Sequence, residues 1–241
     1  MIIGFYSIWH ILLIIVLLLS MYIGLLLIKK YNIKDKDLHK VLVIISIFTF
    51  IFWILSRISY IDHALKDNLV EEFFGTTRTY NWFMVLPNSF CSFIGLVTPF
   101  IIFSNKYKDS KLMEAIYSMA ILGLLTNIFY PEYMSRQPFF EWRTIGAILY
   151  HVTCGYTYII LLYRHILKPK LKNWYYTPTA QFVMITIGVF ELMYLNFAES
   201  FNITKPLVPN LFISTLGFLC LGYVLIDIAF RYLLEKYDSK K

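Results

Sequence analysis

The stretch Trp82–Phe103, WFMVLPNSFCSFIGLVTPFIIF, decides how this chain is interpreted. It is long and apolar enough to cross a bilayer, whose core needs about 20 residues of helix. Its first half nevertheless carries a proline and several polar groups within six residues: Pro87, Asn88, Ser89, Cys91 and Ser92. A simple membrane anchor has no need of these groups. We therefore interpret the stretch as one wall of a polar pocket inside a membrane, with Cys91 as the group best suited to chemistry.

The composition of the chain is that of an α-helical membrane protein. Of its 241 residues, 59% are hydrophobic and only 15% are charged, whereas soluble domains carry about 25% charged residues. The net charge of +7 lies in short loops between apolar runs, so it predicts membrane topology and no nucleic-acid partner. The three cysteines, Cys91, Cys154 and Cys220, match neither a metal-binding spacing nor a disulfide framework. We expect no metal and no cofactor.

Seven segments are long and apolar enough to span a membrane, and they predict an all-α bundle that forms one domain over residues 1–241. No Lys or Arg precedes the first apolar run, so we expect it to be retained as a helix and not removed as a signal peptide. The segments are Ile8–Ile28, Val41–Ile61, Trp82–Phe103, Leu112–Tyr130, Thr144–Tyr163, Thr179–Ala198 and Leu211–Phe230.

The distribution of basic residues predicts the orientation of the bundle. Four segments, 29–40, 104–111, 164–176 and 231–241, hold 16 of the 22 lysines and arginines, and all four fall on the same side of the seven-helix arrangement. Because cytoplasmic loops are enriched in Lys and Arg, this side faces the cytoplasm. The C-terminus is then cytoplasmic and the N-terminus faces outward. We expect an integral protein of a bacterial plasma membrane.

Polar residues inside the predicted spans gather in the outer half of the membrane. At 1.5 Å of rise per residue, Cys91 lies about 13 Å from the outer end of its helix, and His151 and Glu191 about 10 Å from theirs. Three further polar residues lie near the outer helix ends: Arg57, Asn127 and Asn196. Glu114 and Asp227 fall near the cytoplasmic end, within reach of solvent or a basic loop. This asymmetry predicts a pocket that opens to the outer leaflet.

Cys91 and His151 share a depth, as a nucleophile and its base must. A thiol in an apolar site needs an adjacent base, and histidine is the usual base at neutral pH. Asn88 precedes Cys91 by three residues, so in a continuous helix the two would lie on the same face, and Asn88 would donate to an oxyanion. Pro87 would open the helix just before it. Asn127 is a second candidate for the oxyanion.

Several of these assignments have alternatives. We expect Glu191 either to orient His151 or to pair with Arg57. Arg57 in turn is expected either to contact the substrate or to extend outward to a lipid phosphate. Asn196 binds substrate or, like Asn127, joins helices through hydrogen bonds. Cys154 competes with Cys91 for the role of nucleophile, although the adjacent Gly155 favours close helix packing there.

The motifs of the chain resemble those of the YwaF-type integral membrane proteins over roughly residues 40–230. The resemblance rests on LPNSFCSF around Cys91, Asn127 before the Pro131 loop, His151, and the stretches YTPTAQF and LNFAESFNITKP. Animal relatives of this group are lipid acyltransferases that use a Cys in one helix and a His in another. The resemblance therefore implies Cys91 as nucleophile and His151 as base.

These observations predict an intramembrane acyltransferase, or an acyl hydrolase. A membrane phospholipid would donate its acyl chain to Cys91 as a thioester, and a lysolipid or a lipoprotein amine would accept it. The first alternative is a non-enzymatic receptor or carrier for a lipid or small molecule. The second is an ion-coupled transporter that uses Glu191, His151 and Asp227 as a relay.

Overall fold

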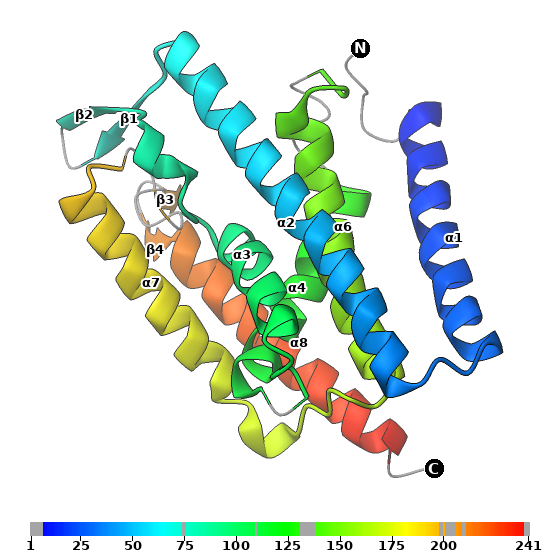
Figure 1. Cartoon of the computed structure of the whole chain (residues 1–241). Coiled ribbons are helices and arrows are strands. Elements are labelled where there is room, and N and C mark those ends of the chain that lie inside the picture. The colour runs from blue at the N-terminus through cyan, green and yellow to red at the C-terminus, as the bar shows by residue number, and fades with distance from the viewer. Residues whose placement is uncertain are drawn as a thin grey trace. The chain divides into compact units, whose positions relative to one another are not determined.

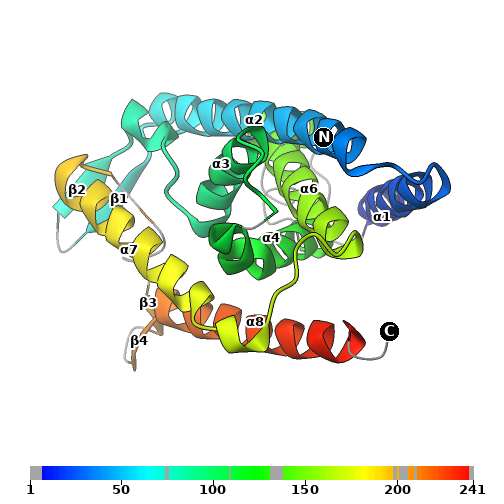
Figure 2. The same cartoon turned by 60° about the horizontal axis from the view of Figure 1, so that its bottom comes forward.

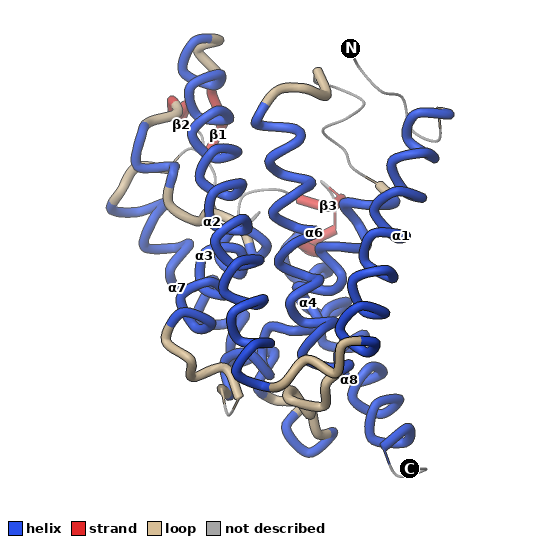
Figure 3. Tube along the Cα trace, turned by 45° about the vertical axis from the view of Figure 1, so that its right-hand side comes forward, coloured by secondary structure: helices blue, strands red, loops and turns tan. Residues whose placement is uncertain are grey.

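The computed structural model describes residues 7–73, 76–108, 110–130, 138–197, 200, 206–208 and 211–238, and α-helices make up most of these residues (Figures 1 and 3). The prediction of an all-α fold is confirmed. The helices are α1 Ile8–Lys30, α2 Asp35–Lys66, α3 Phe90–Phe103, α4 Lys111–Phe129, α6 Trp142–Tyr163, α7 Tyr176–Tyr194 and α8 Thr215–Asp238. The short elements are the 3₁₀ helices η1 Trp82–Val85 and η2 Leu171–Asn173 and the strands β1 Val70–Phe73, β2 Thr76–Thr79, β3 Pro206–Val208 and β4 Leu211–Ser214.

Within the described residues, four helices are long and apolar enough to cross a membrane: α1, α2, α4 and α6. Helix α3 is equally apolar but shorter, with 14 residues. Helix α1 shows why the chain belongs in a bilayer, because it exposes large apolar side chains such as Ile15, Val16 and Leu19. In water this surface would be strongly unfavourable, whereas in lipid it costs nothing. The composition and length of these helices are those of an integral membrane protein.

The third predicted span, Trp82–Phe103, is wrong as a single helix. Its first residues form η1, residues 86–89 are not helical, and α3 begins only at Phe90. Pro87 explains the break, because proline lacks an N–H and its ring disfavours helical geometry at the preceding residue. The expectation that Pro87 opens the helix at this point is therefore confirmed.

Two other predicted spans have different bounds. The predicted Leu211–Phe230 helix begins instead as strand β4, which pairs antiparallel with β3, and α8 then runs from Thr215 to Asp238. The predicted span that ended at Ala198 corresponds to α7, which ends at Tyr194. Between α2 and η1, strands β1 and β2 form an antiparallel hairpin.

The helices divide into two compact units. Unit 1 consists of residues 1–59, 95–109 and 120–167, and unit 2 of residues 60–94, 110–119 and 168–241. Helices α2, α3 and α4 each contribute residues to both units.

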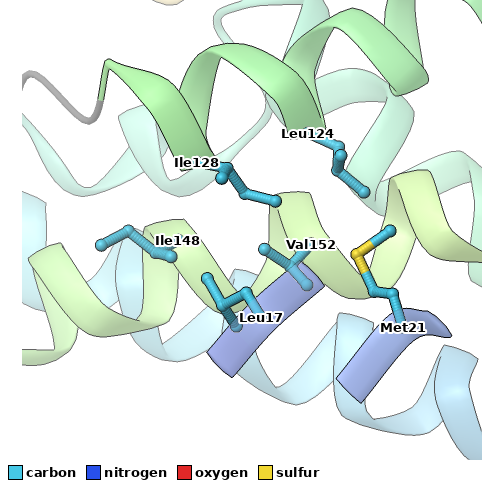
Figure 4. Close-up of a cluster of buried hydrophobic side chains, with 6 residues drawn as sticks. All are labelled: Leu17, Met21, Leu124, Ile128, Ile148 and Val152. Carbon is cyan, nitrogen blue, oxygen red and sulfur yellow. The ribbon is translucent and has the colours of Figure 1, made fainter. Parts of the chain in front are cut away.

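Helix α6 forms the core of unit 1. Apolar side chains from α1, α4 and α6 make one buried cluster (Figure 4): Leu17, Met21, Leu124, Ile128, Ile148 and Val152. Hydrogen bonds add to this packing. The Tyr156 hydroxyl donates to the Met21 carbonyl at 3.0 Å, and the Thr49 hydroxyl donates to Thr153 Oγ1 at 2.9 Å. Such bonds between helices hold a bundle together where lipid supplies no hydrophobic force.

Helices α7 and α8 pack against each other in unit 2 (Figure 2). A second buried cluster joins the end of α2, the β2–η1 segment and the end of α7: Ile61, Ala64, Tyr80, Met84, Leu192 and Phe197. Arg78 on β2 donates to the carbonyls of Leu192 and Phe197 at the C-terminal end of α7. A cation at this position satisfies free carbonyls and complements the helix dipole.

Candidate functional site

Cys91 lies in the first turn of α3, where the helix has just begun. Ser89 caps this end, because its hydroxyl accepts from the Ser92 N–H at 3.2 Å and its carbonyl accepts from the Phe93 N–H at 2.9 Å. The first turn of a helix presents backbone N–H groups without helical partners and the positive end of the dipole. Both stabilise a thiolate and the oxyanion that forms when it attacks a carbonyl.

Asn88 is buried but does not share a helical face with Cys91. Residues 87 and 88 lie in the non-helical segment before α3, so the predicted i, i+3 relationship is wrong. The reason is the proline at 87, which ends the regular geometry on which that spacing argument depends.

His151 is buried in the middle of α6, in unit 1. Its Nδ1 lies 2.6 Å from the carbonyl oxygen of Ala147, one turn earlier. Because a carbonyl only accepts, Nδ1 carries the proton and a neutral ring keeps its lone pair on Nε2. This is the tautomer that a general base uses. Cys91 belongs to unit 2, so the pairing of these two residues stays a prediction.

Cys154 is engaged in packing. Its thiol lies 3.7 Å from Thr98 Oγ1, which is itself hydrogen-bonded to the Tyr158 hydroxyl at 2.9 Å. The close packing expected at Gly155 is confirmed, because a Cβ there would come within 2.5 Å of the Leu124 Cβ. Cys154 is buried whereas Cys91 is only partly buried, so Cys91 is the more accessible of the two candidate nucleophiles.

The other predicted residues of unit 1 have local roles. The side-chain amide of Asn127 donates to the carbonyl of Gly123, in its own helix, at 2.9 Å. This bond occupies one of the two N–H groups of the Asn127 amide, which therefore does not donate to an oxyanion. Arg57 is buried in α2, with 9% of its surface exposed. Its burial argues against extension outward to lipid phosphate.

The other predicted residues of unit 2 lie at the end of α7. Glu191 is buried, and its Oε2 accepts from the Ser200 hydroxyl at 2.6 Å. Asn196 was expected inside a helix, but it lies beyond the end of α7 in a left-handed conformation with φ 52°. Its carbonyl accepts from the Asn81 amide at 2.9 Å. Asparagine tolerates this backbone geometry better than most residues, so Asn196 has a structural role in the turn.

A buried ion network in unit 2 was missed by the sequence reasoning. Arg231 and Asp227 are both fully buried on α8, with Arg231 Nε 2.7 Å from Asp227 Oδ2. Arg231 Nη1 lies 2.7 Å from Glu114 Oε1 on α4, and the Thr177 hydroxyl donates to Asp227 at 2.9 Å. Asp227 was expected within reach of solvent or a basic loop. It is buried from solvent and pairs with Arg231, which the sequence assigned to the basic C-terminal segment. The signal available in the sequence is the i, i+4 spacing of Asp227 and Arg231 in an apolar run.

An apolar pocket of about 330 Å³ lies in unit 2, between the first turns of α4 and α7. Its lining comes from α3, α4 and α7: Phe93, Lys111, Leu112, Ala115, Tyr176, Thr179, Ala180, Val183 and Met184. Its volume falls in the range of small-molecule sites. None of the residues predicted for the Cys–His site lines it. Among the described residues, no group of three or more His, Cys, Asp and Glu side chains is placed to hold a metal ion.

No family model, curated protein or solved structure matches the chain.

Proposed function

We propose that this protein is an intramembrane acyltransferase in which Cys91 is the nucleophile and His151 is the base. A membrane phospholipid donates a fatty acyl chain to the thiol, and a lysolipid or a lipoprotein amine accepts it. The resemblance of the LPNSFCSF and His151 motifs to those of the YwaF-type proteins supports the same assignment.

The position of Cys91 in the first turn of α3 is the observation that carries the proposal. Pro87 interrupts the apolar stretch and Ser89 caps the new helix, so the thiol follows directly on a cap. This arrangement places the thiol at the positive end of the helix dipole, which favours a thiolate and an oxyanion.

The proposed reaction has two halves. In the first, His151 Nε2 takes the thiol proton, and the Cys91 sulfur attacks the ester carbonyl carbon of the phospholipid. The ester C–O bond then breaks, and the leaving lysolipid alkoxide takes the proton from His151. In the second, the acceptor hydroxyl or amine loses a proton to His151 and attacks the thioester, and the thiolate leaves and is reprotonated. No oxidant or further reactant is required.

The proposal includes the seven-span topology, with the N-terminus outside, the C-terminus in the cytoplasm and the polar pocket in the outer half. The basic segments support this orientation. Arg231 no longer counts among the loop charges because it is buried on Asp227. Lys236, Lys240 and Lys241 still give the C-terminal segment its positive charge.

A transfer assay with matched variants tests the proposal. Purified protein receives a phospholipid with an isotope-labelled acyl chain and a lysolipid acceptor, and labelled product is measured by mass spectrometry. Cys91→Ala is expected to abolish transfer, and His151→Gln to lower the rate by about 10²–10⁴-fold. Cys154→Ala, which removes a packed thiol, is the control and is expected to retain transfer. Full activity in Cys91→Ala contradicts the proposal.

A second candidate function is non-catalytic binding of a lipid or small molecule, which the apolar pocket of unit 2 favours. Its lining is predominantly apolar and includes neither Cys91 nor His151, so it suits a receptor or carrier. Saturable ligand binding without acyl transfer, and unchanged in Cys91→Ser, would support this function over the first.

A further inference from the structure

The pocket of unit 2 has a buried apolar floor and an exposed rim. Ala115, Ala180 and Met184 form the floor, with 5%, 8% and 1% of their surface exposed. Leu112 and Val183 at the rim are 40% and 50% exposed. Along α7 the pocket extends from Tyr176 to Met184, which is about 12 Å at 1.5 Å per residue. This shape suits a narrow apolar chain that enters from outside the protein.

Among the described residues that line the pocket, the one with a charged side chain is Lys111, at the start of α4. The acid one turn later, Glu114, is already occupied: its carboxylate accepts from Arg231, from the Lys170 N–H and from the Asn173 amide. Lys111 forms no ion pair with any residue in the described part of the chain. Its exposed ammonium group is therefore available to an anion at the mouth of an apolar pocket.

The mouth of the pocket lies where a membrane surface is expected. Trp174 and Tyr175, just before α7, are about half exposed, and such aromatic residues favour the headgroup level of a bilayer. The segment that contains them also carries three lysines of unit 2: Lys168, Lys170 and Lys172. A basic segment beside a bilayer attracts anionic lipids, by about 1 kcal/mol per Lys or Arg. The floor of the pocket, one to two turns along α7, then lies at the level of the acyl chains.

We propose that this pocket binds one acyl chain of an anionic phospholipid, whose phosphate pairs with Lys111. The occupant is a bilayer lipid because the apolar floor matches an acyl chain, the free cation matches its phosphate, and the aromatic residues place the mouth at headgroup depth. The site is separate from the proposed Cys91 chemistry and does not depend on it. It gives the protein a preference for an anionic membrane.

Lipid retention by purified variants tests this site. Protein extracted in mild detergent is equilibrated with equal amounts of phosphatidylglycerol and phosphatidylcholine, and retained lipids are counted by native mass spectrometry. The wild type is expected to retain phosphatidylglycerol with about a fivefold preference, the factor that corresponds to one lysine at the membrane surface. Lys111→Gln is expected to bind both lipids equally. Lys66→Gln, which changes an exposed lysine outside both the pocket and the basic segment before α7, is the control and should keep the preference.

Two substitutions that fill the pocket test the acyl-chain part. Ala180→Phe acts at the floor, and Val183→Trp acts at the exposed rim, where folding tolerates a large side chain. Both are expected to lose retention of both lipids without a change in thermal stability. Cys91→Ala should retain lipid as the wild type does, which separates this site from the acyltransferase proposal. Three results would overturn the site. The first is wild-type lipid retention in both filled variants, and the second is an unchanged preference for phosphatidylglycerol in Lys111→Gln. The third is a protein dimer that is lost only in the filled variants, which would mean that a second copy of the chain covers the pocket.

Discussion

At the residue scale, the most consequential side chain is Arg231, which holds two carboxylates in the interior of unit 2. It contacts Asp227 on its own helix and Glu114 on α4, and its guanidinium lies 5.4 Å from the centre of the Tyr117 ring. Removing one partner of a buried ion pair leaves an uncompensated charge. The network therefore makes unit 2 dependent on a single side chain.

Arg231→Met is expected to lower the free energy of unfolding by about 3–5 kcal/mol, because it leaves Asp227 and Glu114 without their cation. Unfolding in mixed detergent micelles, followed by circular dichroism, measures this change. Lys108→Met is the matched control: it breaks an exposed pair with Asp35, at 3.1 Å, and should cost less than about 1 kcal/mol. Equal effects of the two substitutions would show that the buried network does not stabilise the fold.

The sequence predicts the polar residues of the spans better than it predicts their partners. Depth along a helix follows from counting residues, so the positions of Cys91 and His151 within their apolar runs could be estimated. The partner of Glu191 could not, because Ser200 lies beyond the end of α7. The burial of Arg231 was hidden for a related reason: the last helix was predicted to end at Phe230, which assigned Arg231 to a loop.

At the element scale, the start of α3 and the packing of α6 carry most of the consequences. Composition indicates an apolar helix over Trp82–Phe103. Hydropathy averaged over a stretch of this length does not register the local effect of Pro87 and Ser89. These two residues divide the stretch into η1, an irregular segment and α3. The close contact at Gly155, by contrast, was predictable, because a small residue within an apolar helix favours close approach of a neighbour.

Gly155→Ala is expected to destabilise unit 1 by about 1–3 kcal/mol, because its added methyl group would overlap Leu124 and force the helices apart. Gly222→Ala on α8 is the control, since a Cβ there meets no described heavy atom within 4 Å. That substitution should stabilise its helix by about 0.5–1 kcal/mol. Thermal unfolding of both variants in one detergent compares them. A Gly155→Ala variant as stable as Gly222→Ala would mean that α6 is not closely packed at Gly155.

At the scale of the whole molecule, the all-α membrane class followed from composition, because long apolar runs leave few alternatives. The bounds of the spans were harder to predict. The sequence suggested seven spans, whereas four helices among the described residues are long and apolar enough to cross a membrane. The hairpins β1–β2 and β3–β4 fall at the ends of helices. Short hairpins of this kind carry too weak a sequence pattern to be separated from helix ends.

The proposed topology predicts which positions react from outside the cell. With the native cysteines replaced by serine or alanine, Asp67→Cys should react with a membrane-impermeant maleimide on intact cells. Lys172→Cys should react only after the membrane is opened, because its segment belongs to the basic, cytoplasmic side. Gel shifts of the labelled protein report both results. Labelling of Lys172→Cys in intact cells would contradict the orientation.

The central claim, that Cys91 carries an acyl chain, is tested most directly by the intact mass of the protein after incubation with phospholipid. The account predicts one added acyl group that neutral hydroxylamine removes, absent from Cys91→Ala and present in Cys154→Ala. It also predicts that His151→Gln slows the appearance of this adduct. An unmodified wild-type mass, or an adduct that persists in Cys91→Ala, would contradict the account.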